Sequence, residues 1–202
     1  MPIRFPDPPP PVAEAIEQQR SPGRRGPLRR LRQRGGAVER GPVPAQPVFT
    51  VGLEELLEES REGGAEERIS GTPTWRYTRF GVGGEPEVLE LGAPAAGAPV
   101  AAGDDRFSPA IREALAVADQ DPRVRDHDYE ARLLRVPALS LLALWLHSGS
   151  SLDLFVPVGR PAPGIERNRL YEDEEFMAAV RSAAEQARAV YEQADNPDEL
   201  GS

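Results

Sequence analysis

The sequence has no cysteine, no lysine and only two histidines among its 202 residues. Without cysteine, the chain can form no disulfide, thiolate nucleophile or cysteine-ligated zinc or iron–sulfur site. Without lysine, it can use neither Schiff-base chemistry nor the phosphate-binding lysine of P-loop proteins and protein kinases. All 24 basic side chains are therefore arginines. A high-GC coding bias explains this usage without a functional demand for guanidinium groups.

Long apolar runs are also lacking. The longest, at 138–146, is broken by Ser140 and falls short of the roughly 20 apolar residues that a membrane-spanning helix needs. The first residues, MPIRFPDP, lack the apolar core of a secretory signal. We therefore expect a soluble, cytoplasmic protein without a membrane span.

Proline and glycine are abundant, with 22 and 19 residues, whereas hydrophobic residues make up only 39% of the chain. The first 47 residues combine frequent proline with arginine, a composition that disfavours helix interiors and central strands. A helix at 12–19 would have two turns, which is marginal in water. The sequence thus predicts a disordered Pro/Arg-rich arm at 1–47, a single domain at 48–194 and a flexible tail at 195–202.

The arm and the remainder of the chain carry opposite charge. Up to Arg40 there are nine arginines and four acids, a net charge of +5, whereas the remainder has 15 arginines and 29 acids, a net charge of −14. The segment 20–40 has no aromatic side chain for base stacking. Its arginines can contact nucleic-acid phosphates, an acidic protein or the acidic remainder of the chain. The predicted contact residues are Arg24, Arg25, Arg29, Arg30, Arg32 and Arg34.

The first half of the remainder predicts one helix and two strands. Thr50 can cap a helix at 50–59, in which the leucines share one face. The segment 74–80 alternates aromatic with polar residues, as in a strand. A glycine-rich turn leads from it to a second strand at 87–91. The Ala/Gly/Pro-rich segment 93–103 predicts a loop.

The second half predicts a helix, two strands and a final helix. Ser108 and the proline after it are typical of a helix start, and this helix ends before Pro122. The apolar segment 138–147 is long enough for a buried helix, but a short Ser/Gly loop connects it to an alternating segment at 152–158, which favours strands. Helical spacing resumes from Glu172 onward.

The predicted fold is therefore α+β. After the disordered arm, the element order is α-β-β-α-β-β-α, which favours an antiparallel sheet of about four strands with helices packed on it. A weak twofold repetition of strand, strand, helix has no residue-level similarity to support it.

His127 is a candidate for acid–base chemistry. It lies in the sequence Asp126-His127-Asp128, which contains a base and carboxylate ligands. However, adjacent side chains point in different directions, so the sequence favours a solvated loop over a site here.

His147 and Asp153 are the other catalytic candidates. If 138–147 and 152–158 are paired strands, these two residues face each other and form an acid–base couple. Trp145 and Phe155 would lie beside them. The sequence thus predicts a pocket or interface on the segment from Trp145 to Phe155.

No cofactor or metal site is expected. The acids at 104–105 and 172–175 are typical of a solvated loop and of a helix start. The glycines at 81–84 precede a strand instead of a helix, so they do not form a dinucleotide-binding motif.

Three functional classes remain. We expect a non-catalytic adaptor or accessory protein of a bacterial cytoplasm, with another protein as its partner, because the sequence shows no evident nucleophile. The first alternative is a nucleic-acid accessory protein that binds phosphates through the arm. The second is a small-molecule enzyme or binder with a pocket near His147.

Overall fold

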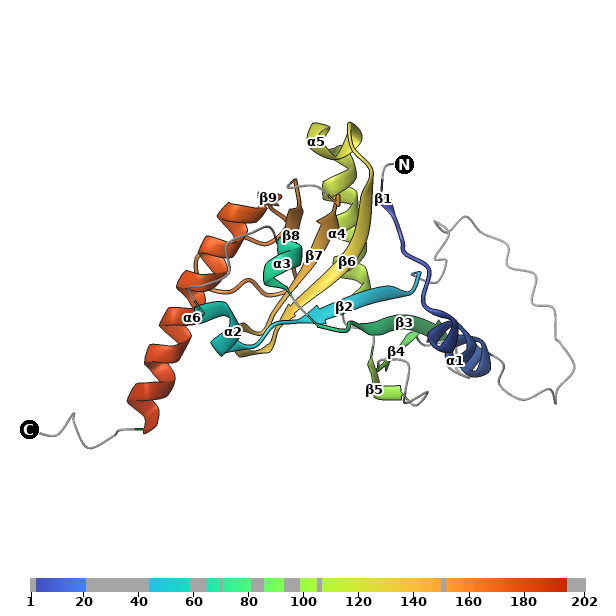
Figure 1. Ribbon diagram of the computed structural model, residues 1–202, viewed down its shortest axis with the longest axis horizontal. Helices are drawn as coiled ribbons and strands as arrows, with labels where there is room; N and C mark the ends of the chain where they lie inside the picture. The colour runs from blue at the N-terminus through green and yellow to red at the C-terminus, as the bar shows by residue number, and fades with distance from the viewer. Residues whose placement is uncertain are drawn as a thin grey trace, which may run out of the picture.

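The computed structural model describes residues 3–20, 44–58, 65–69, 71–80, 86–92, 99–104, 107–149 and 152–195 (Figure 1). The strands are β1 Ile3–Arg4, β2 Gln46–Thr50, β3 Thr74–Phe80, β4 Pro86–Leu91, β5 Pro99–Asp104, β6 Tyr129–Val136, β7 Leu141–His147, β8 Leu154–Val158 and β9 Tyr171–Glu172. The helices are α1 Pro10–Arg20, α2 Leu53–Leu57, α3 Ala65–Arg68, α4 Ser108–Gln120, α5 Pro122–Arg125 and α6 Asp173–Asp195, with a 3-10 turn, η1, at Pro137–Leu139.

The described strands form one nine-stranded mixed sheet. Eight of them follow the order β5-β4-β3-β2-β6-β7-β8-β9, and β1 pairs with β6 outside this order. β2 is parallel to β6, with Val48 opposite Leu133. β1 is parallel to the start of β6, with Ile3 opposite Tyr129. The other neighbouring pairs are antiparallel. The predicted antiparallel sheet of about four strands in the order α-β-β-α-β-β-α is therefore wrong, because the sheet is larger and mixed.

The missed strands have two physical explanations. β1, β2 and β9 are short and gain their stability from strands elsewhere in the chain, which local sequence patterns do not reveal. β5 occupies part of the segment that was expected to be a loop, because ladder pairing with β4 outweighs its poor strand composition. β6 was also missed, but for neither of these reasons. Its residues are alternately buried and half-buried over most of the strand, and this alternation was already present in the sequence.

Residues 3–20 contain β1 and α1, whereas the sequence predicted disorder there. Val12, Ala15 and Ile16 of α1 are buried against Trp75 and Tyr77 of β3. This packing supplies the stability that a short isolated helix lacks. The expectation of a disordered arm therefore fails for β1 and α1, and residues 21–43 lie outside the described residues.

Two predicted features of the sheet are confirmed. β3 and β4 pair as antiparallel neighbours, with Trp75 opposite Leu91, and the intervening residues 81–85 lie outside the described part of the chain. The segment 138–147 forms η1 and then the strand β7. β7 lies between β6 and β8 and is buried on both faces.

The predicted helices form, but two of them start differently. α2 follows Gly52, because Thr50 is the last residue of β2 and cannot cap the helix. α4 is preceded by Phe107, and Ser108 is its first helical residue. The Ser108 hydroxyl lies 3.2 Å from Thr78 Oγ1, so it joins the helix to the sheet.

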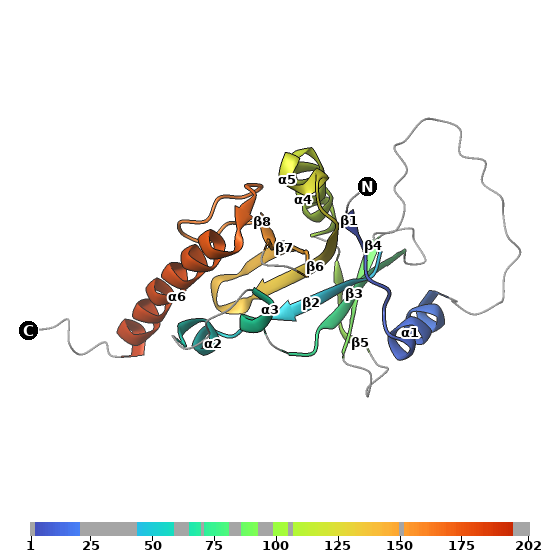
Figure 2. The same cartoon turned by 45° about the horizontal axis from the view of Figure 1, so that its top comes forward.

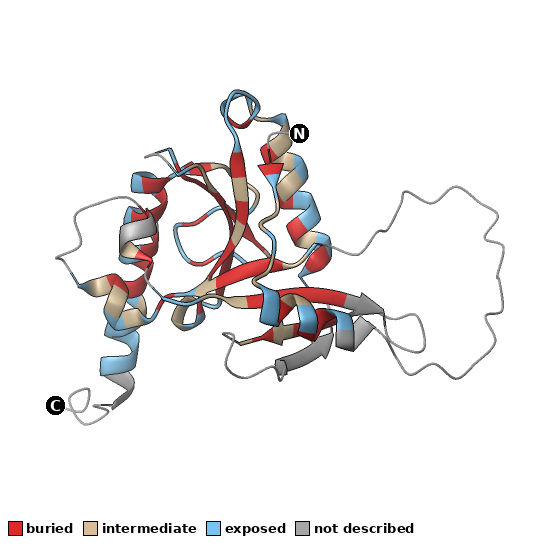
Figure 3. Cartoon of the chain, turned by 45° about the vertical axis from the view of Figure 1, so that its right-hand side comes forward, coloured by how far each residue is buried: buried red, intermediate tan, exposed pale blue. Residues whose placement is uncertain are grey.

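Helices cover both faces of the β6–β8 part of the sheet (Figure 2). On one face, Phe176 of α6 packs with Trp145 and Phe155 and with side chains of α2 and α3. On the other face, Ile111 of α4 packs against Leu144 and its neighbours. The buried residues consequently lie along the strands and inner helix faces in the middle of the molecule (Figure 3).

α6 is the longest helix, and its C-terminal part extends away from the sheet (Figure 1). Val190 and Tyr191 are exposed there. None of the helices within the described ranges combines the length and apolar character needed to cross a membrane.

Candidate functional site

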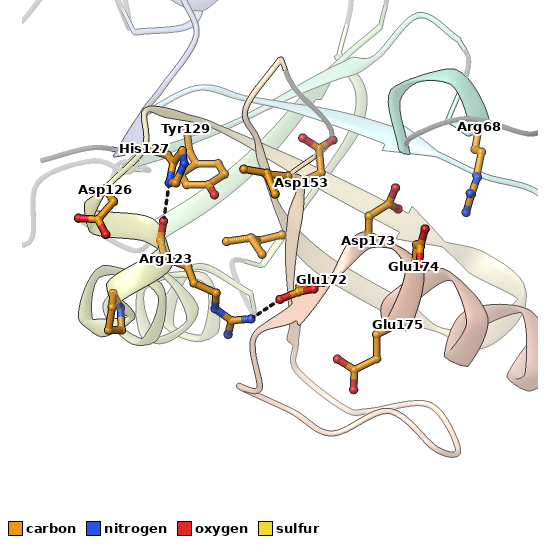
Figure 4. Close-up of a pocket in the computed structure, with 13 residues that line it drawn as sticks. Arg68, Arg123, Asp126, His127, Tyr129, Asp153, Glu172, Asp173, Glu174 and Glu175 are labelled. Atoms are coloured by element: carbon orange, nitrogen blue, oxygen red, sulfur yellow. Dashed lines mark hydrogen bonds and ion pairs between the residues drawn. The ribbon is translucent and has the colours of Figure 1, made fainter.

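A pocket of about 760 Å³ opens at the end of the sheet where β6 and β8 begin and β9 leads into α6. Four separate segments of the chain contribute to it. We call it the acidic pocket; it is lined by Arg68, Pro122, Arg123, Asp126, His127, Tyr129, Leu152, Asp153, Leu154, Glu172, Asp173, Glu174 and Glu175. Figure 4 shows Arg123, His127 and Tyr129 on one side and Glu172, Asp173 and Glu175 on the other.

The acidic pocket carries an excess of negative charge, with six carboxylates and two arginines in its lining. Arg123 is already paired, because it donates hydrogen bonds of 3.0 Å to Glu172 and to Asp121 outside the pocket. The apolar part of the wall includes Leu152, whose residue surface is 51% exposed. A concave surface with charge of one sign concentrates the electric field and attracts groups of the opposite sign.

The α5 wall is fixed by a short capping sequence. Asp121 is the N-cap of α5, and its carboxylate accepts a 2.9 Å hydrogen bond from the Arg123 backbone N–H. The proline at the first helical position favours this start. The side chain of Arg123 also donates to Asp121, which lowers the pKa of that carboxyl. This arrangement orients Arg123 toward Glu172.

His127 and Asp126 lie on the same wall and are exposed. The Nδ1 atom of His127 is 3.2 Å from the carbonyl oxygen of Arg123, and its ring centre is 6.3 Å from that of Tyr129. Asp128 is not among the lining residues. The structure therefore brings the predicted candidate His127 to the pocket with only one of its two neighbouring acids.

Asp153 is the other predicted candidate in the pocket wall, and its carboxylate has three polar contacts. Trp145 Nε1 donates to Oδ2 at 2.8 Å, and the backbone N–H of Ser148 donates to Oδ1 at 3.0 Å. His147 Nδ1 lies 3.1 Å from Oδ2. The carboxylate thereby joins the end of β7 to the start of β8.

The structure thus places His147 beside Asp153, the pairing that strand alternation predicts. However, His147 is not among the lining residues, whereas Asp153, which it contacts, is one of them. Trp145 and Phe155 are 0% exposed, so they are core residues and offer no surface to a partner. The Phe155 ring stacks on Phe176 of α6 with centroids 4.4 Å apart. The prediction of a pocket or interface at Trp145 and Phe155 fails because α6 covers this face.

Asp173, the first residue of α6, is the second buried aspartate of the wall and is 9% exposed. The backbone N–H of Ala65, at the start of α3, donates to its carboxylate. The Oδ1 atom has no hydrogen-bond partner. Burial raises the pKa of Asp173, and the nearby charge of Arg68 opposes this effect.

Tyr129 is a pocket residue that the sequence did not indicate. It is the first residue of β6 and is 1% exposed. Burial, followed by the negative charge of Asp153, raises the pKa of its hydroxyl. Arg123 and Asp173 were also missed, although the acids at 172–175 were visible as a cluster and were interpreted as a helix start.

The chemistry of the acidic pocket favours binding of positive charge. Among the residues that the structure describes, no group of three or more histidines or carboxylates is placed to hold a metal ion. The arginines predicted to contact phosphates or an acidic partner, Arg24, Arg25, Arg29, Arg30, Arg32 and Arg34, lie outside the described residues. Their role stays a prediction.

Comparison of the chain with protein-family models, with curated proteins and with solved structures finds no match in any of the three. The residue types and geometry of the acidic pocket are therefore the basis on which a function can be proposed.

Proposed function

We propose that this chain is a non-catalytic interaction protein and that the acidic pocket is the surface with which it binds another protein. The observation that carries the proposal is a pocket of about 760 Å³ lined by six carboxylates and two arginines. Surplus charge of one sign supports selection of an oppositely charged partner and accelerates its approach. The exposed Leu152 and the neighbouring Pro122 add the apolar contact that a recognition surface needs.

The state of Asp153 also supports a binding role. Its two oxygens are used by contacts with Trp145 and His147 of β7 and with Ser148, which follows β7. A buried carboxylate with several donors is typical of a structural tie. The alternative, a small-molecule enzyme, is favoured by the His147–Asp153 contact at the pocket wall. It would require substrate to reach His147, which is not among the lining residues.

The test compares the interaction partners of three full-length variants by affinity purification with quantitative mass spectrometry. Asp126→Asn/Glu174→Gln removes two exposed charges from the pocket rim. The control Glu14→Gln/Glu185→Gln removes two exposed charges elsewhere. The third variant replaces residues 21–43 by a neutral linker of equal length. Deleting 1–47 instead would remove β1, α1 and part of β2 along with their buried side chains.

We expect a partner that is retained by wild type and by the control but is depleted about tenfold by the pocket variant. Purified partner should then show the same order of affinities in direct titration. Equal retention by all three variants would refute the pocket as the binding surface. Loss confined to the linker variant would instead favour the arm, and a gel shift at low salt would then decide whether nucleic acid is its ligand.

A further inference from the structure

We infer that the acidic pocket receives a basic side chain of the protein partner, an arginine or a lysine, whose charged group hydrogen-bonds to Asp173. This inference rests on the proposed function and specifies the chemistry of the partner segment that enters the pocket. It starts from the hydrogen bonding of Asp173.

One oxygen of the Asp173 carboxylate has a structural role, and the other oxygen is unused. The backbone N–H of Ala65 donates to it, which ties the start of α3 to the start of α6. Oδ1 accepts no hydrogen bond, although the residue is only 9% exposed. A buried acceptor without a partner is unfavourable, because it has lost water and gained nothing in return. Asp173 lines the acidic pocket, so a donor bound in this pocket lies beside its carboxylate (Figure 4).

The surroundings of Asp173 select a cationic donor. Asp153, Glu172 and Glu174 belong to the same lining and repel an anion. Arg68 attracts Asp173 electrostatically, yet Oδ1 accepts no hydrogen bond from it. The described carboxylates and histidines form no group that could hold a metal ion. An organic ammonium or guanidinium group, which donates directional hydrogen bonds, fits these conditions.

The apolar part of the lining fits the aliphatic stem of such a side chain. Leu152, Leu154 and Pro122 belong to the same pocket, and Leu152 is 51% exposed. Arginine and lysine place their methylene groups on apolar surface while the charged end reaches a polar partner. The pocket volume of about 760 Å³ exceeds what one side chain fills, so the neighbouring residues of a partner segment have room as well. We therefore assign the cation to a protein partner.

Capped single residues test this inference with the full chain. The probes are N-acetyl-arginine methylamide, N-acetyl-lysine methylamide and the uncharged citrulline analogue, titrated at low salt and followed by ¹⁵N NMR. We expect at least one basic probe to shift the amide signals of Ala65 and Asp173, and the citrulline probe to leave them unchanged. The wild-type titration is informative by itself, so a variant that fails to fold does not prevent the test.

Asp173→Asn is the decisive variant. Asparagine keeps an oxygen for the Ala65 N–H and replaces the other oxygen by a donor, so affinity for the basic probe should fall about tenfold or more. Glu185→Gln removes the same charge from an exposed site on α6 outside the pocket, and its affinity should stay within about twofold of wild type.

Three results would overturn the inference: no binding of either basic probe, equal binding of the citrulline probe, or undiminished binding by Asp173→Asn. Tighter binding of agmatine than of capped arginine would assign the pocket to small amines and overturn the partner assignment. If Asp126→Asn/Glu174→Gln releases the protein partner while no basic probe binds, the inference fails and the proposed function stands. If a basic probe binds through Asp173 but the variant Asp126→Asn/Glu174→Gln keeps every protein partner, the proposed function fails.

Discussion

The β8 wall and the α6 wall of the acidic pocket each carry one buried aspartate, and the two differ in how their oxygens are used. Asp153 has contacts with Trp145, His147 and Ser148 on its two oxygens. Asp173 accepts from Ala65 and has one oxygen without a partner. Burial alone therefore does not distinguish a structural carboxylate from one that can bind a ligand; the count of donors does.

The largest expected effect is at Asp153. Asp153→Ala leaves the buried Trp145 Nε1 and the Ser148 N–H without their acceptor, so we expect a loss of roughly 3 kcal/mol in the free energy of unfolding. Trp145→Phe removes one donor only and should lose less. Urea denaturation measures both. A loss for Asp153→Ala no greater than that for the matched variant Asp173→Ala would contradict the difference between the two walls.

An intermediate effect is expected at Asp173, and it depends on pH. Because burial raises its pKa in the folded protein, the stability contributed by Asp173 is complete below its unfolded pKa and is lost as pH rises through its folded pKa. Asp173→Asn does not titrate, so wild type should lose stability relative to this variant as pH rises from the ordinary aspartate pKa through the raised folded value. The difference at pH 7 should be on the order of 1 kcal/mol. Parallel unfolding curves at each pH provide the measurement, and a constant difference would be the contrary result.

The smallest expected effect is on the exposed α5 wall. The side chain of Arg123 is 45% exposed and that of Glu172 is 68% exposed, so solvent and salt screen their pairing. Arg123→Gln should change the free energy of unfolding by less than about 1 kcal/mol. It should also reduce the loss of stability at acidic pH, because Arg123 lowers the pKa of Asp121 and this contribution disappears as pH falls through the folded value. A thermal melt series over pH and salt checks both points.

Local sequence patterns predicted the parts of the fold in which neighbours in sequence are neighbours in space. The β3–β4 pair and the β7–β8 pair follow from alternation within short segments, and the second brings His147 and Asp153 together. The parallel pairing of β1 and β2 with β6 could not be predicted in this way, because the partners are distant in sequence. The sheet was underestimated for this reason.

The acidic pocket was only partly predictable. His127 and Asp153 were candidates from their residue types, but nothing local indicated that α6 would lie beside them. The acids at 172–175 already had a sufficient local explanation as a helix start. The hydrogen bonding of the Asp173 carboxylate, with Ala65 of α3 as one donor and no partner for Oδ1, arises only in the folded chain. No local sequence pattern indicates it.

The pairing of β1 with β6 has a consequence for biosynthesis. Ile3 pairs with Tyr129, so β1 leaves the ribosome well over a hundred residues before its partner strand exists. Contacts between distant residues form late, because closing a long loop costs entropy before the contact repays it. β1 is thus unpaired until β6 has emerged, and the central sheet is completed only after that point.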